Sequence, residues 1–154
     1  MSFPKYVYVA SSWRCETQQM VCHVLDAANI EYYDFKNPPE NTGFAWSEVM
    51  PSFDINEQRA DVKEYLAALD HPRSVEGFNS DFDAMQKADC FILVLPCGRS
   101  AHLEMGWAVG QGKRTAILLD PNENNEVTPE LMYKMCDLVT DDMMELLDWL
   151  QVKD

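Results

Sequence analysis

A glycine-containing turn between two apolar stretches carries the residues that are best suited to chemistry. Residues 95–106 read LPCGRSAHLEMG, and they place Glu104 four positions after Ser100. Ser100 is a good N-cap, so we expect a helix over Ala101–Gln111 with Glu104 in its second turn. A capping-box acid would fall at Leu103, so capping does not explain Glu104. The exposed N–H groups of a helix start favour an ionised carboxylate, which can attack a sugar anomeric carbon or stabilise an oxocarbenium ion. The alternative is a solvated acid that complements the helix dipole.

Two segments rich in hydrogen-bond donors accompany this acid. Beside it in the sequence stand Gly98, Arg99, Ser100 and His102. The second segment, after the first apolar stretch, consists of Ser11, Ser12, Trp13 and Arg14. Hydroxyls, a backbone turn and a guanidinium at a helix start can hold a phosphate or a sugar hydroxyl, and an indole can stack on a base. The alternative for the second segment is an N-cap followed by a surface arginine.

Three further residues are candidates for the binding pocket. Asp81 precedes an apolar helical stripe, where it could hydrogen-bond a nucleobase or protonate a leaving base if its pKa were raised. The alternative is N-capping of that helix by Ser80 or Asp81. Phe44 and Trp46 are apolar residues in a polar loop, and they either roof the pocket or anchor the loop to the core.

Strand and helix patterns alternate along the whole chain, which predicts a doubly wound α/β fold of about five parallel strands in a single domain over residues 1–154. The expected strands are Lys5–Ala10, Ile30–Phe35, Asp89–Leu95, Arg114–Leu119 and an edge strand over Cys136–Val139. The expected helices include Cys15–Asn29, Val75–Ala88 with a break near Gly77, a short helix over Pro129–Met135, and Asp141–Leu150. Ligands of such sheets bind outside the carboxyl ends of the strands, which is where the donor-rich segments fall.

Composition narrows the classes of function. With 26 acidic and 12 basic residues the formal net charge is −14, which disfavours binding to a nucleic-acid backbone. No apolar run approaches the roughly 20 residues that span a bilayer, and the start lacks a signal pattern, so a cytoplasmic protein with no membrane partner is expected. The five cysteines form no Cys-x-x-Cys pair, and no histidine spacing supports a metal. No cofactor is expected, and Cys97 is expected to lack a chemical role.

With these residues in view, the sequence resembles the nucleoside 2-deoxyribosyltransferase superfamily, which includes nucleotide N-glycosidases. The resemblance extends over almost the whole chain. It is carried by Tyr8-Val9-Ala10-Ser11-Ser12, Asn79-Ser80-Asp81, Ala88-Asp89, Ser100-Ala101-His102-Leu103-Glu104-Met105-Gly106-Trp107-Ala108 and Gly112-Lys113. It implies that Glu104 is the nucleophile, which forms a glycosyl ester, and that Asp81 contacts and helps protonate the base. A homodimer or a higher homo-oligomer is also expected.

Two positions depart from the family pattern. Gly98 stands where deoxyribosyltransferases carry an aspartate, and Glu130 stands where they carry an asparagine that enters a neighbouring subunit's site. Arg99, Ser100 and His102 instead favour a phosphorylated substrate. The expected function is cleavage or transfer of the N-glycosidic bond of a nucleoside or a nucleoside 5′-monophosphate. The alternatives are a non-catalytic nucleotide-binding or sensing domain and an enzyme like the NAD glycohydrolases.

Overall fold

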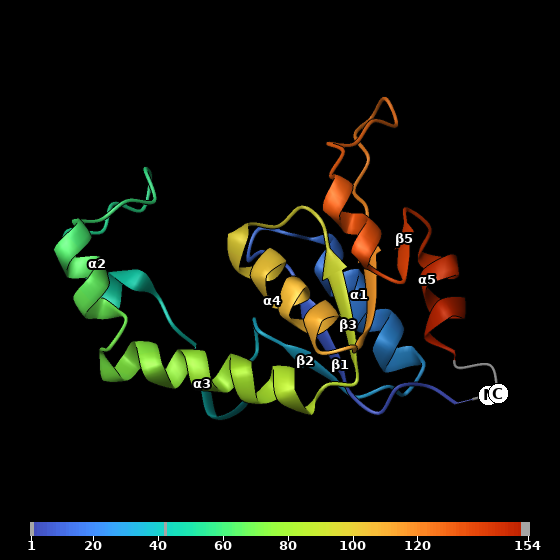
Figure 1. The fold of residues 1–154 in the computed structure, drawn as a ribbon, viewed down its shortest axis with the longest axis horizontal. Coiled ribbons are helices and arrows are strands. Elements are labelled where there is room, and N and C mark those ends of the chain that lie inside the picture. Colours follow the sequence, from blue (N-terminus) through green and yellow to red (C-terminus); the bar gives the residue numbers. More distant parts are fainter. Residues whose placement is uncertain (1, 42, 152–154) are drawn as a thin grey trace. The chain divides into compact units, whose positions relative to one another are not determined.

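The computed structural model describes residues 2–41 and 43–151, and these contain a five-stranded parallel sheet (Figure 1). The strands follow the order β2-β1-β3-β4-β5. Their bounds are β1 (Val7–Ala10), β2 (Tyr32–Asp34), β3 (Cys90–Val94), β4 (Arg114–Leu118) and β5 (Leu138–Thr140). The predicted doubly wound α/β fold is therefore confirmed, with strands one to three residues shorter than predicted.

The central strand β3 explains the near-continuous apolar run in the sequence. All five of its residues are fully buried, because neighbouring strands cover its edges and helices cover both faces of the sheet. Its register with β1 pairs Ala10 with Leu93, and its register with β4 pairs Leu93 with Ile117. The carboxyl ends of β1 and β3 are thus level, so the loops that follow them start at the same edge of the sheet.

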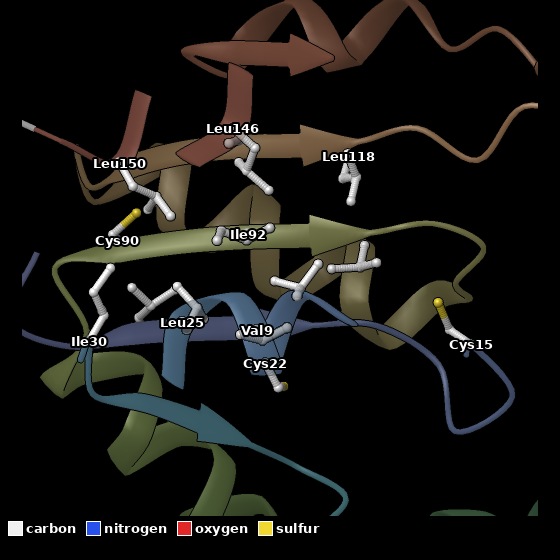
Figure 2. Close-up of a cluster of buried hydrophobic side chains, with 14 residues drawn as sticks. Val9, Cys15, Cys22, Leu25, Ile30, Cys90, Ile92, Leu118, Leu146 and Leu150 are labelled. Atoms are coloured by element: carbon white, nitrogen blue, oxygen red, sulfur yellow. The ribbon is translucent and has the colours of Figure 1, made fainter. Parts of the chain in front are cut away.

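Helices α1 (Thr17–Ala27) and α5 (Met143–Leu150) pack on one face of this sheet. Figure 2 shows Ile92 of β3 between Leu146 of α5 and Leu25 of α1, and Val9 of β1 belongs to the same buried cluster. Helix α4 (Arg99–Gly110) packs on β1, β3 and β4, and it buries Ala101, Met105 and Ala108. On these strands Tyr8 stacks on Phe91 with ring centroids 4.9 Å apart. The sheet is therefore covered on both faces, and α4 starts directly after β3.

The described chain divides into two compact units. The first comprises Met1–Asp34 and Met85–Asp154, and it holds the sheet with α1, α4, α5 and the 3-10 helix η3 (Leu131–Met135). The second comprises Phe35–Ala84. It holds the 3-10 helices η1 (Pro39–Asn41) and η2 (Trp46–Glu48), helix α2 (Val62–Ala68) and most of α3 (Pro72–Lys87). The single domain expected over residues 1–154 stays a prediction.

Within the second unit an arginine fastens a loop to a helix. Arg73, in the first turn of α3, forms ion pairs with Glu48 and Glu76 and donates to the carbonyl of Gly43. Four residues further on, Gly77 lets Phe44 lie against the helix, since a Cβ atom at Gly77 would be 3.0 Å from the Cβ of Phe44. The break predicted near Gly77 is wrong, because here the missing side chain makes room for a neighbour rather than a bend.

No helix in the described part of the chain is both long enough and apolar enough to cross a membrane.

Candidate functional site

Helix α4 begins two residues earlier than the sequence predicts. Its N-cap is Gly98 in an extended conformation, and Ser100 is an exposed residue of the first turn. The prediction of Ser100 as the N-cap is therefore wrong. The turn after β3 passes directly into the helix, and the N–H of His102 donates to the Gly98 carbonyl at 3.4 Å. No side chain of the described residues caps this start, so its N–H groups stay available to an anion. Glu104 lies in the second turn, as predicted.

Side chains hold the loops after β1 and β3 together. The Ser11 hydroxyl donates to the Val94 carbonyl at 2.8 Å, and the Cys15 thiol donates to the Leu95 carbonyl at 3.5 Å. The Ser12 hydroxyl accepts from the N–H of Arg14 at 3.3 Å. The N-cap of α1 is Glu16, so the capping alternative for the Ser11–Arg14 segment is wrong. The structure thus brings both donor-rich segments to one edge of the sheet, and the hydroxyl of Ser11 serves the fold.

Two exposed arginines lie at this edge of the sheet. Arg14 follows β1 and Arg99 opens α4, and neither guanidinium has an ion-pair or hydrogen-bond partner among residues 2–41 and 43–151. Arg114, by contrast, donates to the carbonyls of Trp149 and Leu150. In a chain with a net charge of −14, two arginines without acidic partners at the carboxyl edge of the sheet create a local preference for an anion. Both were predicted as binding residues.

A half-buried thiol lies near Glu104. Burial, followed by smaller effects of Cys15 and Glu104, raises the pKa of Cys97 to about 12. A reactive thiol needs an electropositive and accessible setting that lowers its pKa, so this thiol stays protonated at neutral pH. The absence of a chemical role for Cys97 stays a prediction.

His102 is engaged on both sides of its ring. Its Nδ1 lies 2.7 Å from the carbonyl oxygen of Gly98, and its Nε2 lies 2.8 Å from the phenol oxygen of Tyr133 in η3. The two rings are nearly parallel, with 16° between their planes. The sequence predicted His102 as a binding residue, and both of its nitrogens already have partners within the protein.

Tyr133 was not predicted as a site residue. No local pattern could have found it, since the contact joins positions 31 residues apart. The segment that carries it is held by a carboxylate of Glu130, which accepts from the N–H of Met132 at 2.9 Å. The structure therefore adds a phenol to the start of α4.

The second unit holds the remaining predicted residues. Asp81 lies in the interior of α3, nine residues after the helix begins at Pro72, so the N-capping alternative for it is wrong. Phe44 and Trp46 contact each other edge to face with centroids 5.0 Å apart, and Trp46 contacts Tyr65 at 5.7 Å. Both predicted alternatives for these two residues, a roof over the pocket and an anchor to the core, stay predictions.

Two open clefts occur in the first unit at the edge of the sheet opposite to the predicted site residues. One, of about 360 Å³, is lined by Tyr6, Asp26, Asn29, Ile30, Glu31 and Tyr32. The other, of about 250 Å³, is lined by Val109, Gly112, Lys113, Arg114, Thr115, Met135 and Asp137. Both lie beside the amino ends of strands and contain no predicted site residue. In the described ranges, no group of three histidine, cysteine or acidic side chains is placed to hold a metal ion.

No protein-family model matches the chain, and no curated protein matches it. Among solved structures, a 2-deoxyribosyltransferase from the psychrotolerant bacterium Bacillus psychrosaccharolyticus matches with a TM-score of 0.55 at 14% identity, over 96% of this chain and 97% of that one. The chain has the fold of this 2-deoxyribosyltransferase. The resemblance inferred from the sequence is thus confirmed for the 2-deoxyribosyltransferase fold. The CMP N-glycosidase BcmB from Clostridium botulinum also matches, with a TM-score of 0.48 at 18% identity, over 95% of this chain and 97% of that one.

Proposed function

We propose that this chain cleaves or transfers the N-glycosidic bond of a nucleoside or a nucleoside 5′-monophosphate, with Glu104 as the nucleophile. The observation that carries the proposal is the grouping at one sheet edge. Glu104 projects from the second turn of α4, and Arg14 and Arg99 stand without acidic partners on the two loops that meet there. The fold of a 2-deoxyribosyltransferase supports the same reading.

The reaction follows from this arrangement in two steps. The Glu104 carboxylate attacks C1′ of the sugar, the bond from C1′ to the base nitrogen breaks, and the base leaves with a proton. A general acid supplies that proton. A glycosyl ester of Glu104 remains. Water then attacks C1′ of the ester, or a second base does, and the carboxylate is released unchanged.

The donors around Glu104 favour a phosphorylated substrate. The uncapped N–H groups at the start of α4 and the guanidinium of Arg99 lie at the same helix end, and a helix N-terminus with an adjacent cation is a good site for a phosphate. Arg14 offers a second cation from the loop after β1. We therefore expect a 5′-monophosphate to be a better substrate than the corresponding nucleoside.

The proposal is tested by release of base. The protein is incubated with nucleosides, their 5′-monophosphates and NAD, and the products are separated by chromatography. Glu104→Gln is expected to abolish release while the folded state, checked by circular dichroism and thermal melting, is kept. Glu123→Gln removes an exposed carboxylate elsewhere in the first unit and serves as the matched control. Release of base by Glu104→Gln at the wild-type rate would contradict the assignment of Glu104 as the nucleophile.

A non-catalytic nucleotide-binding domain is the second candidate. It is favoured by Gly98, which leaves open space where the resemblance places an aspartate in the transferases. The same experiment separates the two candidates. A nucleotide that raises the melting temperature without losing its base favours binding alone, and release of nicotinamide from NAD would favour an enzyme like the NAD glycohydrolases.

A further inference from the structure

The direction of a hydrogen-bond chain at the start of α4 is fixed by its first member. The carbonyl of Gly98 can only accept, so the proton of a neutral His102 ring must sit on Nδ1, which lies 2.7 Å from that oxygen. The sulfur of Cys97 also lies within reach, at 3.6 Å from the same Nδ1, but a bare Nδ1 would face the carbonyl oxygen of Gly98 lone pair to lone pair at 2.7 Å. Nε2 then carries a lone pair and accepts.

The second link of the chain follows from the first. Because Nε2 accepts, the O–H of Tyr133 must donate to it across 2.8 Å. Burial, with smaller effects of Cys97, Glu130 and Cys136, raises the pKa of Tyr133, so the phenol keeps this proton at neutral pH. With its one proton committed to His102, the phenol oxygen can offer only lone pairs to any further partner.

We propose that the phenol oxygen of Tyr133 is a specificity-determining acceptor, which selects substrates that present an O–H or N–H group to it. The inference rests on the proposed function, because the selected group belongs to the substrate of Glu104. Tyr133 is only half-buried, which leaves part of its ring accessible. An anionic group is disfavoured at this position, because two acceptors would face each other. The phosphate is therefore expected to contact Arg14 and Arg99, and Tyr133 is expected to contact another part of the substrate.

A hydrogen bond places this phenol at the start of the helix that carries the candidate nucleophile. Cys97 lies there too, with its sulfur 3.6 Å from Nδ1 of His102. His102, two residues before Glu104 on α4, is the direct partner of the phenol. Three groups that differ between nucleotides carry suitable donors, namely the 2′-hydroxyl of ribose, the exocyclic amine of cytosine or adenine, and the ring N–H of uracil or hypoxanthine.

The first test determines, without any substrate, which nitrogen of His102 carries the proton. Imidazole ¹⁵N NMR of the wild-type protein at alkaline pH is expected to show Nδ1 of His102 protonated and Nε2 bare. Tyr133→Phe is expected to shift only the Nε2 resonance strongly, because that nitrogen loses its donor. A protonated Nε2 and a bare Nδ1 in the wild type would overturn the inference, since Tyr133 would then be free to donate.

The second test reads selectivity. The wild type and Tyr133→Phe are compared on 5′-monophosphates of cytosine and uracil, and of adenine and hypoxanthine, each with ribose and with 2′-deoxyribose. Loss of the acceptor is expected to lower kcat/KM about three- to tenfold for substrates that carry the recognised donor, which corresponds to one ordinary hydrogen bond. Substrates that lack the donor are expected to be unaffected. An effect that follows ribose assigns the 2′-hydroxyl, one that follows cytosine and adenine assigns the amine, and one that follows uracil and hypoxanthine assigns the ring N–H.

The controls separate this inference from the proposed function. Tyr32→Phe removes another phenol, which donates to Asp26 at 3.2 Å beside the amino ends of the strands, and it is expected to leave selectivity unchanged. If Tyr133→Phe lowers kcat/KM of every substrate by the same factor, or of none, the inference is wrong while the function stands. If the wild type neither cleaves nor binds any member of the panel, the proposed function is wrong and the inference falls with it.

Discussion

Replacing Arg99 by glutamine tests the phosphate assignment most directly. Arg99 is exposed in the first turn of α4 and has no side-chain partner in the described ranges, so its loss is expected to change the free energy of unfolding by no more than about 0.5 kcal/mol. A hydrogen bond to a charged group contributes about 1.5–3 kcal/mol, and exposed ion pairs contribute about 0.2–1 kcal/mol. We take about 1 kcal/mol for this exposed position.

That value predicts a rise of about fivefold in KM for a 5′-monophosphate. Arg14→Gln is expected to have a similar effect, and the double variant about 25-fold if the two effects are additive. The KM of the corresponding nucleoside is expected to stay the same, because no phosphate is lost from the contact. Arg59→Gln, an exposed arginine of the second unit, is the matched control and is expected to resemble the wild type for both substrates.

Base release measured at low and high salt completes the assay. The Debye length falls from about 10 Å at 0.1 M to about 3 Å at 1 M ionic strength, so the preference of the wild type for the 5′-monophosphate is expected to shrink towards that of Arg99→Gln. An equal rise in KM for nucleoside and 5′-monophosphate would refute the reasoning, since it would show that Arg99 supports the site without contacting a phosphate.

Three further predictions concern stability and reactivity. Gly77→Ala is expected to lower the free energy of unfolding by about 1–3 kcal/mol in urea titrations, because the new Cβ would crowd Phe44. Gly106→Ala is the control: nothing lies within 4 Å of a Cβ atom there, so the substitution is expected to raise the free energy of unfolding by about 0.5–1 kcal/mol. Equal effects at both glycines would contradict the packing argument. Ser11→Ala is expected to cost about 0.5–1.5 kcal/mol in the same titrations, since it removes the bond to the β3 carbonyl, and no loss of stability would count against a role for that hydroxyl in the fold. Cys97 is expected to resist alkylation by iodoacetamide at pH 8 and to react faster only at strongly alkaline pH, because its raised pKa keeps the thiol protonated. Rapid labelling at pH 7 would show that the thiol is not kept protonated.

The order of elements and the place of Glu104 could be predicted because both follow from local pattern. The apolar run of β3 and the alternation of strand and helix identify the sheet, and a carboxylate in the second turn after the central strand must lie at its carboxyl edge. The chain-wide resemblance to the 2-deoxyribosyltransferase family pointed to the same architecture. These inferences need only residue types and their spacing along the chain.

What could not be predicted depends on contacts between distant segments. Gly77 looks like a helix breaker in sequence, and only the position of Phe44 shows why it is in a helix. The N-cap was placed at Ser100 by residue preference, whereas the turn after β3 starts the helix at Gly98. No local sequence pattern indicates a role for Tyr133, because its partner His102 comes from another element.

The sheet ends on both sides in a strand of three residues, β2 and β5. A border this short offers few unpaired N–H and C=O groups to a foreign strand, so it is a poor template for fibril growth or strand exchange. Helices and loops are therefore the better surfaces for any contact between copies of this chain, which leaves the continuity of the sheet undisturbed by assembly.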